Sequence, residues 1–178
     1  MKKANAGGWK VEDAIEREAA AVDGFVARFI AFNRLYNELW AQKHGVMPEF
    51  AKGEAKKHKD PESKRASEDV VARVDSPAVL ERMETDLRNV REMLTRDDGF
   101  YLKRPKEKPF FRSYESWSEN KRLTKTLKAL YLLRCNLFHG SKGLETSQER
   151  ILEPANACLD VIIEEGVKAL ETWEPTRS

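Results

Sequence analysis

Apolar residues recur along the chain at intervals of three and four, the period of a helix with one buried face. The first and longest such segment covers 11–43 and has a broad apolar face. Gly45 follows it and Pro48 comes three residues later, which is the usual order after a helix end. We therefore predict a first helix that ends near His44 and follows an N-terminal tail over residues 1–10.

A second long helix is predicted to start where Ser76 supplies an N-cap and Pro77 a first-turn proline. Its apolar residues repeat in steps of three and four until about Arg96. A shorter helical piece over 67–74 is expected before it.

Two more helices are predicted in the C-terminal half of the chain. Ser118 can cap a third main helix that runs to Phe138 or one residue further, and its second half is apolar almost all round. The fourth covers about 147–173, with Pro154 in its first turns or at a kink. Because no segment alternates like a strand, the fold class is all-α, a bundle of four to five helices.

Two segments lack this periodicity and are predicted to be loops. Residues 45–64 are rich in Lys, Glu, Gly and Pro and are interpreted as a mobile basic loop. Residues 97–116 alternate aromatic and basic side chains, which could stack unpaired bases and neutralise phosphates. The competing interpretation is that these aromatic side chains only fix a long loop to the bundle.

Composition narrows the class of protein. With 178 residues the chain is expected to form a single domain, residues 1–178. Its 32 basic and 30 acidic side chains leave a net charge of +2, so attraction to nucleic acid must come from local patches. There is no apolar run of the ~18 residues that a membrane span requires and no signal-like start, which favours a cytoplasmic protein with no membrane partner.

The cysteines and histidines argue against metal chemistry. Cys135 and Cys158 each lie in an apolar helical stretch, where a free thiol acts as a small hydrophobic side chain. Neither they nor the three histidines have the spacing of a zinc site. We expect no metal and no cofactor.

Arg134 interrupts the apolar stripe of the third main helix, between Leu130 and Leu137. A buried guanidinium is costly without a partner, so one interpretation is that Arg134 pairs with a carboxylate from another helix. Its neighbours favour a functional interpretation. Asn136 and His139 share a helix face, and a histidine at a helix end can be both held and exposed, as a general acid or base requires.

One geometric condition applies to this pair. His139 follows Arg134 by five positions, which places the two side chains about 140° apart around an ideal helix. They converge only if the helix unwinds near Phe138 or if two copies meet across a two-fold axis. The all-round apolar helix favours the second arrangement, a homodimer that buries this helix.

The run from Tyr131 to Lys142, with the sequence YLLRCNLFHGSK, resembles the Arg-x4-6-His motif of HEPN domains (higher eukaryotes and prokaryotes nucleotide-binding). Small prokaryotic members have a similar Arg-Asn-Asn-Leu-Phe-His-Gly run. Residues 32–37, with the sequence FNRLYN, are also similar to the opening helix of some of these proteins. One position departs from the pattern, because the residue after the motif arginine is commonly polar and here it is Cys135.

The resemblance implies metal-independent RNA cleavage in a dimer cleft, of the kind used in toxin–antitoxin or phage-defence systems. His139 would assist attack by the ribose 2′-hydroxyl, Arg134 would stabilise charge on the phosphoryl oxygens, and Asn136 would orient the phosphate or the imidazole. RNA is then the substrate, and an antitoxin or defence-system protein is a possible partner. Two alternatives stay open: a catalytically silent HEPN module that binds RNA, a nucleotide or a partner protein, and a helical scaffold with a structural Arg134. The basic residues expected to bind RNA are Lys103, Arg104, Lys106, Lys108 and Lys142.

Overall fold

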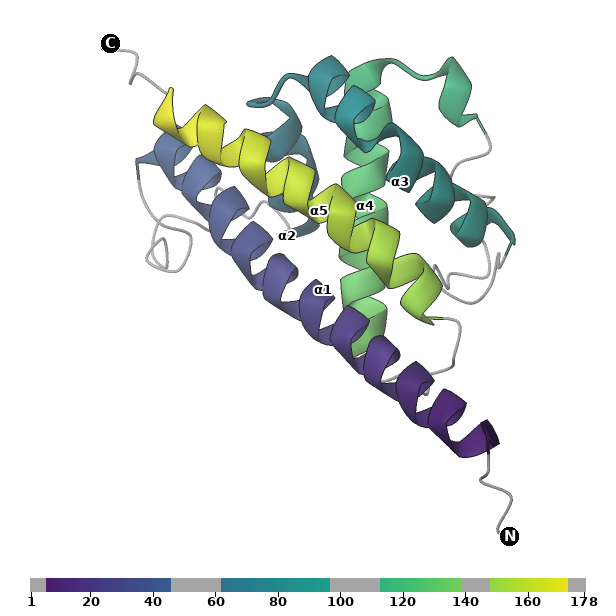
Figure 1. Ribbon diagram of the computed structural model, residues 1–178. Coiled ribbons are helices and arrows are strands. Elements are labelled where there is room, and N and C mark those ends of the chain that lie inside the picture. Colours follow the sequence, from purple (N-terminus) through teal and green to yellow (C-terminus); the bar gives the residue numbers. More distant parts are fainter. Residues whose placement is uncertain (1–5, 46–61, 97–112, 139–147, 173–178) are drawn as a thin grey trace, which may run out of the picture.

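The computed structural model describes residues 6–45, 62–96, 113–138 and 148–172 (Figure 1). Every regular element among these residues is helical, which confirms the all-α class. Four long helices form the bundle, and a short helical segment lies between the first two. The elements are α1 (Ala6–His44), α2 (Glu62–Lys64), the π-helical turn η1 (Arg65–Asp69), α3 (Ser76–Arg96), the 3₁₀ turn η2 (Tyr114–Ser116), α4 (Glu119–Phe138) and α5 (Gln148–Glu171).

Helix α1 ends where the sequence predicts and begins earlier. At its end the Gly45 amide donates to the Ala41 carbonyl at 2.7 Å, and Gly45 has a φ of 70°, which glycine adopts without strain. At its start the helix already includes residues 6–10, so the expected N-terminal tail was wrong over these five residues. The apolar pattern locates only the packed part of a helix, and the residues that precede it, AGGWK, include two glycines, so intrinsic helix propensity did not indicate this extension either.

The bounds of α3 match the prediction, but the capping residue differs. The Asp75 carboxylate accepts a hydrogen bond from the Ala78 amide at 3.4 Å and so caps the first turn. The predicted cap, Ser76, has a buried hydroxyl that makes no hydrogen bond. The start of α4 after Ser118 and its end at Phe138 are as predicted. Pro154 lies in the second turn of α5, as expected.

Helices α1 and α5 lie side by side and run in the same direction, as Figure 1 shows. Asn156 of α5 donates to the Ala21 carbonyl at 3.2 Å near the beginning of the contact. Gln42 donates to the Leu170 carbonyl at 3.4 Å near its end. Helix α4 lies behind α5 in this view and carries the apolar stripe predicted from the sequence into the core. Side chains that are fully buried there include Phe25, Phe32, Leu123, Leu127, Leu130, Leu159 and Ile162.

The segment formed by α2 and η1 packs against both α1 and α4. Lys43 of α1 binds Asp69 at 3.0 Å, and Lys128 of α4 binds Glu68 at 3.0 Å. The short helical piece expected at 67–74 thus begins earlier, at Glu62. Residues 62–64 were assigned to the mobile basic loop, and this was wrong because their packing partners come from distant parts of the chain. The loop residues 46–61 lie outside the described part of the chain.

The end of the aromatic and basic segment is also ordered. Tyr114 is buried beside Trp117, with ring centroids 5.9 Å apart, and the Arg91 guanidinium lies 3.7 Å from the Tyr114 ring centre. For these residues the interpretation that aromatic side chains fix the segment to the bundle fits the contacts. Residues 97–112 lie outside the described residues.

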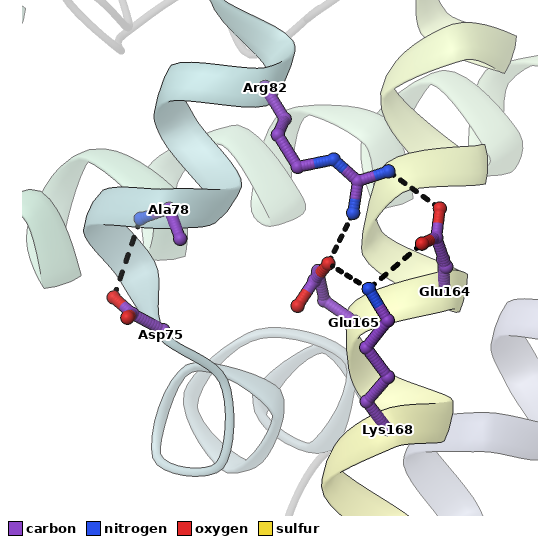
Figure 2. A network of polar contacts seen from close by, with 6 residues as sticks. All are labelled: Asp75, Ala78, Arg82, Glu164, Glu165 and Lys168. Atoms are coloured by element: carbon purple, nitrogen blue, oxygen red, sulfur yellow. Dashed lines mark hydrogen bonds and ion pairs between the residues drawn. The ribbon is translucent and has the colours of Figure 1, made fainter.

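An exposed polar network joins α3 to α5 on the surface (Figure 2). Arg82 of α3 binds Glu164 at 2.6 Å and also Glu165, and Lys168 binds both of these carboxylates.

Of the helices that the structure describes, none has the length and apolarity needed to span a membrane.

Candidate functional site

Among the predicted site residues, Arg134 is the one whose side chain belongs to the described part of the chain. Arg134 lies on the last turns of α4, and Asn136 follows it in the same helix. The side chain of Asn136 and all of His139 lie outside the described residues. The same holds for the basic residues predicted to bind RNA, namely Lys103, Arg104, Lys106, Lys108 and Lys142.

Arg134 is half-buried between aromatic rings. Its guanidinium carbon lies 5.7 Å from the ring centre of Phe29 and 6.0 Å from that of Tyr131, distances at which a cation is attracted by an aromatic face. Its Nη1 lies 4.0 Å from the Cys135 sulfur. Partial burial lowers the pKa of Arg134, but the Cys135 sulfur and the Glu62 carboxylate raise it by more, so the group stays charged.

The carboxylate whose charge raises the pKa of Arg134 is that of Glu62, a residue that was not singled out from the sequence. Glu62 of α2 accepts hydrogen bonds from two tyrosines, the Tyr36 hydroxyl at 2.5 Å and the Tyr131 hydroxyl at 3.1 Å. These tyrosines lie on α1 and α4, so one side chain connects three elements. The sequence contains one indication of such a residue, because Tyr36 and Tyr131 lie in apolar helix faces, where a buried hydroxyl needs a hydrogen-bond partner.

Both tyrosines are donors at neutral pH. Burial, followed by the charge of Glu62, raises the pKa of Tyr131 to about 12. Burial and the bond to Glu62 raise the pKa of Tyr36 further above its ordinary value of 10. The hydroxyl protons therefore stay on the tyrosines, which donate them to the two oxygens of Glu62.

A polar row on α1 continues this cluster. The Asn37 amide donates to the Asn33 side-chain oxygen at 2.7 Å, and its own oxygen accepts from Arg65 Nε at 3.2 Å. Asn33, Tyr36 and Asn37 are spaced as neighbours on one helix face. Tyr36 and Asn37 therefore face α2 and η1, whereas Arg34 of the same stretch is 70% exposed and pairs with Glu38.

The two cysteines are free, as predicted, and differ in their surroundings. Cys158 is fully buried in α5, and burial raises the pKa of its thiol to about 12, which makes it unreactive. Cys135 is half-buried and contacts Arg134. Of the two thiols, only Cys135 can influence the candidate site.

The apolar second half of α4 is covered in large part by its own bundle. Leu130 and Leu133 are buried, and Leu132 and Leu137 are half-buried. Among the described residues, large apolar side chains are exposed elsewhere, with Ile30 on α1 (65% exposed) standing out most. Association through the motif helix accordingly stays a prediction.

The cluster of Glu62, Tyr36, Tyr131 and Arg134, called here the Glu62 cluster, brings together the two stretches that resemble HEPN sequences. Its geometry offers a fixed cation beside aromatic faces, which suits a phosphate next to an unpaired base. No three His, Cys, Asp or Glu side chains of the described ranges are grouped as metal ligands. Comparisons with protein-family models, with curated proteins and with solved structures gave no match.

Proposed function

We propose that the protein is a metal-independent endoribonuclease of toxin or phage-defence type that acts on RNA in the cytoplasm. The observation that carries the proposal is the contact between segments 29–37 and 131–135, which meet around Arg134 through the Phe29 ring and Glu62. They overlap the stretches 32–37 and 131–142, whose sequences resemble HEPN domains, and Phe29 lies one helix turn before the first of these. A cation held by aromatic contacts at their meeting point suits a phosphate-binding role.

In the proposed reaction His139 removes the proton of a ribose 2′-hydroxyl, whose oxygen then attacks the adjacent phosphorus. The bond from phosphorus to the 5′-oxygen breaks, and a protonated imidazole returns a proton to that leaving oxygen. Arg134 stabilises the negative charge on the phosphoryl oxygens, and Asn136 orients the phosphate or the imidazole. The chemistry needs the 2′-hydroxyl, so DNA of the same sequence should resist cleavage.

We place the site in a homodimer cleft, with His139 acting on a phosphate held in part by the second copy. Arg134 and His139 lie about 140° apart on one ideal helix, and two copies that meet across a two-fold axis can bring these side chains into one cleft. The basic residues of 97–112 and Lys142 would bind the RNA backbone. An antitoxin or another defence-system protein would restrain the activity.

A catalytically silent HEPN module that binds RNA, a nucleotide or a partner protein is the second candidate, and one contact favours it. Cys135 takes the place of the residue that is commonly polar after the motif arginine, and its sulfur lies beside Arg134. Sulfur is a weak acceptor, so it would hold the guanidinium less firmly than an amide or carboxylate oxygen does.

The test incubates purified protein with total RNA in excess EDTA and analyses the product ends. We expect cleavage with 2′,3′-cyclic phosphate or 3′-phosphate ends, and a loss of about 10²-fold or more in the His139→Ala variant at an unchanged melting temperature. His44→Ala is the matched control and should retain full activity. A wild type that binds RNA without cleaving it would favour the silent module, and Cys135→Asn is then the variant to test for restored cleavage.

A further inference from the structure

The Glu62 cluster connects the helix that carries Arg134 to two other elements, through Glu62 of α2 and Tyr36 of α1. Tyr36 is fully buried and donates to one oxygen of Glu62, while Tyr131 donates to the other. The Tyr131 ring centre lies 6.0 Å from the Arg134 guanidinium carbon, and the Cys135 sulfur lies 4.0 Å from Arg134 Nη1. A series of contacts therefore leads from Tyr36 of α1 through Glu62 and Tyr131 to the guanidinium.

The backbone at this place is unusual as well. Glu62 opens the three-residue helix α2 (Glu62–Lys64), which directly precedes the π-helical turn η1, a geometry that is rare and occurs mostly at functional sites. The side chains of this turn and of Glu62 contact both α1 and α4. A carboxylate held at two oxygens by buried hydroxyls is also costly unless both bonds are kept, so it fixes one arrangement of its neighbours.

We propose that Glu62 is a positioning residue of the Arg134 site. Its carboxylate fixes the Tyr131 ring, and that ring together with the Cys135 sulfur sets the direction of the guanidinium toward a bound phosphate. The effect of Glu62 on catalysis rests on the proposed function. Its effect on the direction of the Arg134 guanidinium does not depend on that function.

The sign of the effect separates positioning from simple electrostatics. Glu62→Gln removes a negative charge next to an anion site, which by charge alone would strengthen RNA binding and speed the reaction. Positioning predicts the opposite, because the amide has a single acceptor oxygen for two tyrosine hydroxyls. Glu68→Gln is the matched control, since it removes the same charge from the same segment, at an exposed ion pair with Lys128.

The first measurement is steady-state cleavage of RNA by wild type, Glu62→Gln and Glu68→Gln. We expect kcat to fall by about 10-fold or more in Glu62→Gln with KM nearly unchanged, and Glu68→Gln to match the wild type. Tyr131→Phe removes one hydroxyl and keeps the ring, so it should lower kcat in the same direction even if Glu62→Gln does not fold. Unchanged kcat in Glu62→Gln and Tyr131→Phe would overturn the proposal.

The second measurement does not depend on activity. Phenylglyoxal modifies arginine side chains, and peptide mass spectrometry gives the rate at Arg134 alone. We expect this rate to rise several-fold in Glu62→Gln and Tyr131→Phe and not in Glu68→Gln. If the wild type cleaves no RNA but the rate rises, the proposed function fails and the positioning role holds. An unchanged rate in both variants overturns the positioning role, whatever the wild type cleaves.

Discussion

Two polar clusters join helices in this protein, and they differ in their access to water. The network of Arg82, Glu164, Glu165 and Lys168 lies on the surface between α3 and α5, and its arginine and first carboxylate are 39% and 52% exposed (Figure 2). The Glu62 cluster lies between α1, α2 and α4, with Tyr36 fully buried and Arg134 half-buried. Both contain a half-buried carboxylate, Glu165 (17% exposed) in the first and Glu62 in the second, but only the second has a fully buried polar side chain, that of Tyr36.

The difference predicts which cluster is more sensitive to substitution. Exposed ion pairs form and break at little cost, because water replaces the lost partner. The fully buried Tyr36 hydroxyl has no such replacement, and Glu62 and Tyr131 are half-buried, so water compensates less for a lost partner in the Glu62 cluster. Substitutions in the exposed network should therefore act locally and weakly, and those in the Glu62 cluster should change both stability and the site.

The largest expected contrast is between two arginines. We expect Arg134→Ala to lose about 10²-fold or more of the RNA cleavage rate, because the variant lacks the cation that stabilises the phosphoryl charge. Its stability should fall by only about 1 kcal/mol, the order of a partly exposed cation–aromatic contact. Cleavage assays and thermal melts of the same preparations measure both effects.

Arg82→Ala is the matched control for this contrast, since it removes an arginine from a helix of the same bundle. It should cleave RNA like the wild type. An Arg134→Ala variant that is fully active would remove Arg134 from the site, and one that is inactive only because it unfolds would favour the scaffold interpretation.

An intermediate effect is expected for Tyr36→Phe, which removes one hydroxyl from the buried cluster. The Glu62 oxygen then loses its closest donor, so the free energy of unfolding should fall by about 1–3 kcal/mol. Urea denaturation measures this loss. Glu164→Gln in the exposed network is the comparison, and a loss in Tyr36→Phe no larger than in that variant would contradict the distinction between the two clusters.

Several features of the fold were predictable from local sequence. Periodicity placed the ends of α3 and α4 correctly, because those helices are bounded by strong local signals and bury one continuous stripe. Arg134 could be singled out as a candidate site residue, because a charged side chain in an apolar helix stripe is unusual. The cap of α3 was misassigned to Ser76 by one residue, since Asp75 is an equally good capping residue and only the contact with Ala78 decides between them.

Glu62 could not be found in this way. Its partners Tyr36 and Tyr131 are 26 and 69 residues away in the sequence, and no local pattern connects them. The surrounding Lys, Glu and Pro residues resemble a solvated loop, because composition reports what a segment can bury alone and not what the bundle brings to it. Tertiary contacts of this kind decide which charged residue becomes a structural partner.

The smallest expected effect concerns the exposed network and its dependence on pH. Hydrogen bonds from Arg82, and then from Lys168, hold the pKa of Glu164 at about 2, compared with an ordinary value of 4.5. A lowered pKa means that the stabilisation is present above pH 4.5 and is lost as the pH falls toward 2. We therefore expect the melting temperature of Glu164→Gln to lie slightly below that of the wild type at pH 7, with the difference shrinking as the pH falls below 4.5.

High salt provides the control for this measurement. In 1 M NaCl the screening length is about 3 Å, so the small difference at pH 7 should nearly vanish because the network is exposed to solvent. The Tyr36→Phe difference should persist in the same buffer, since its hydroxyl is buried. A Glu164→Gln difference that resists both acid and salt would mean that this network is shielded from water like the Glu62 cluster, and the contrast between the two regions would then fail.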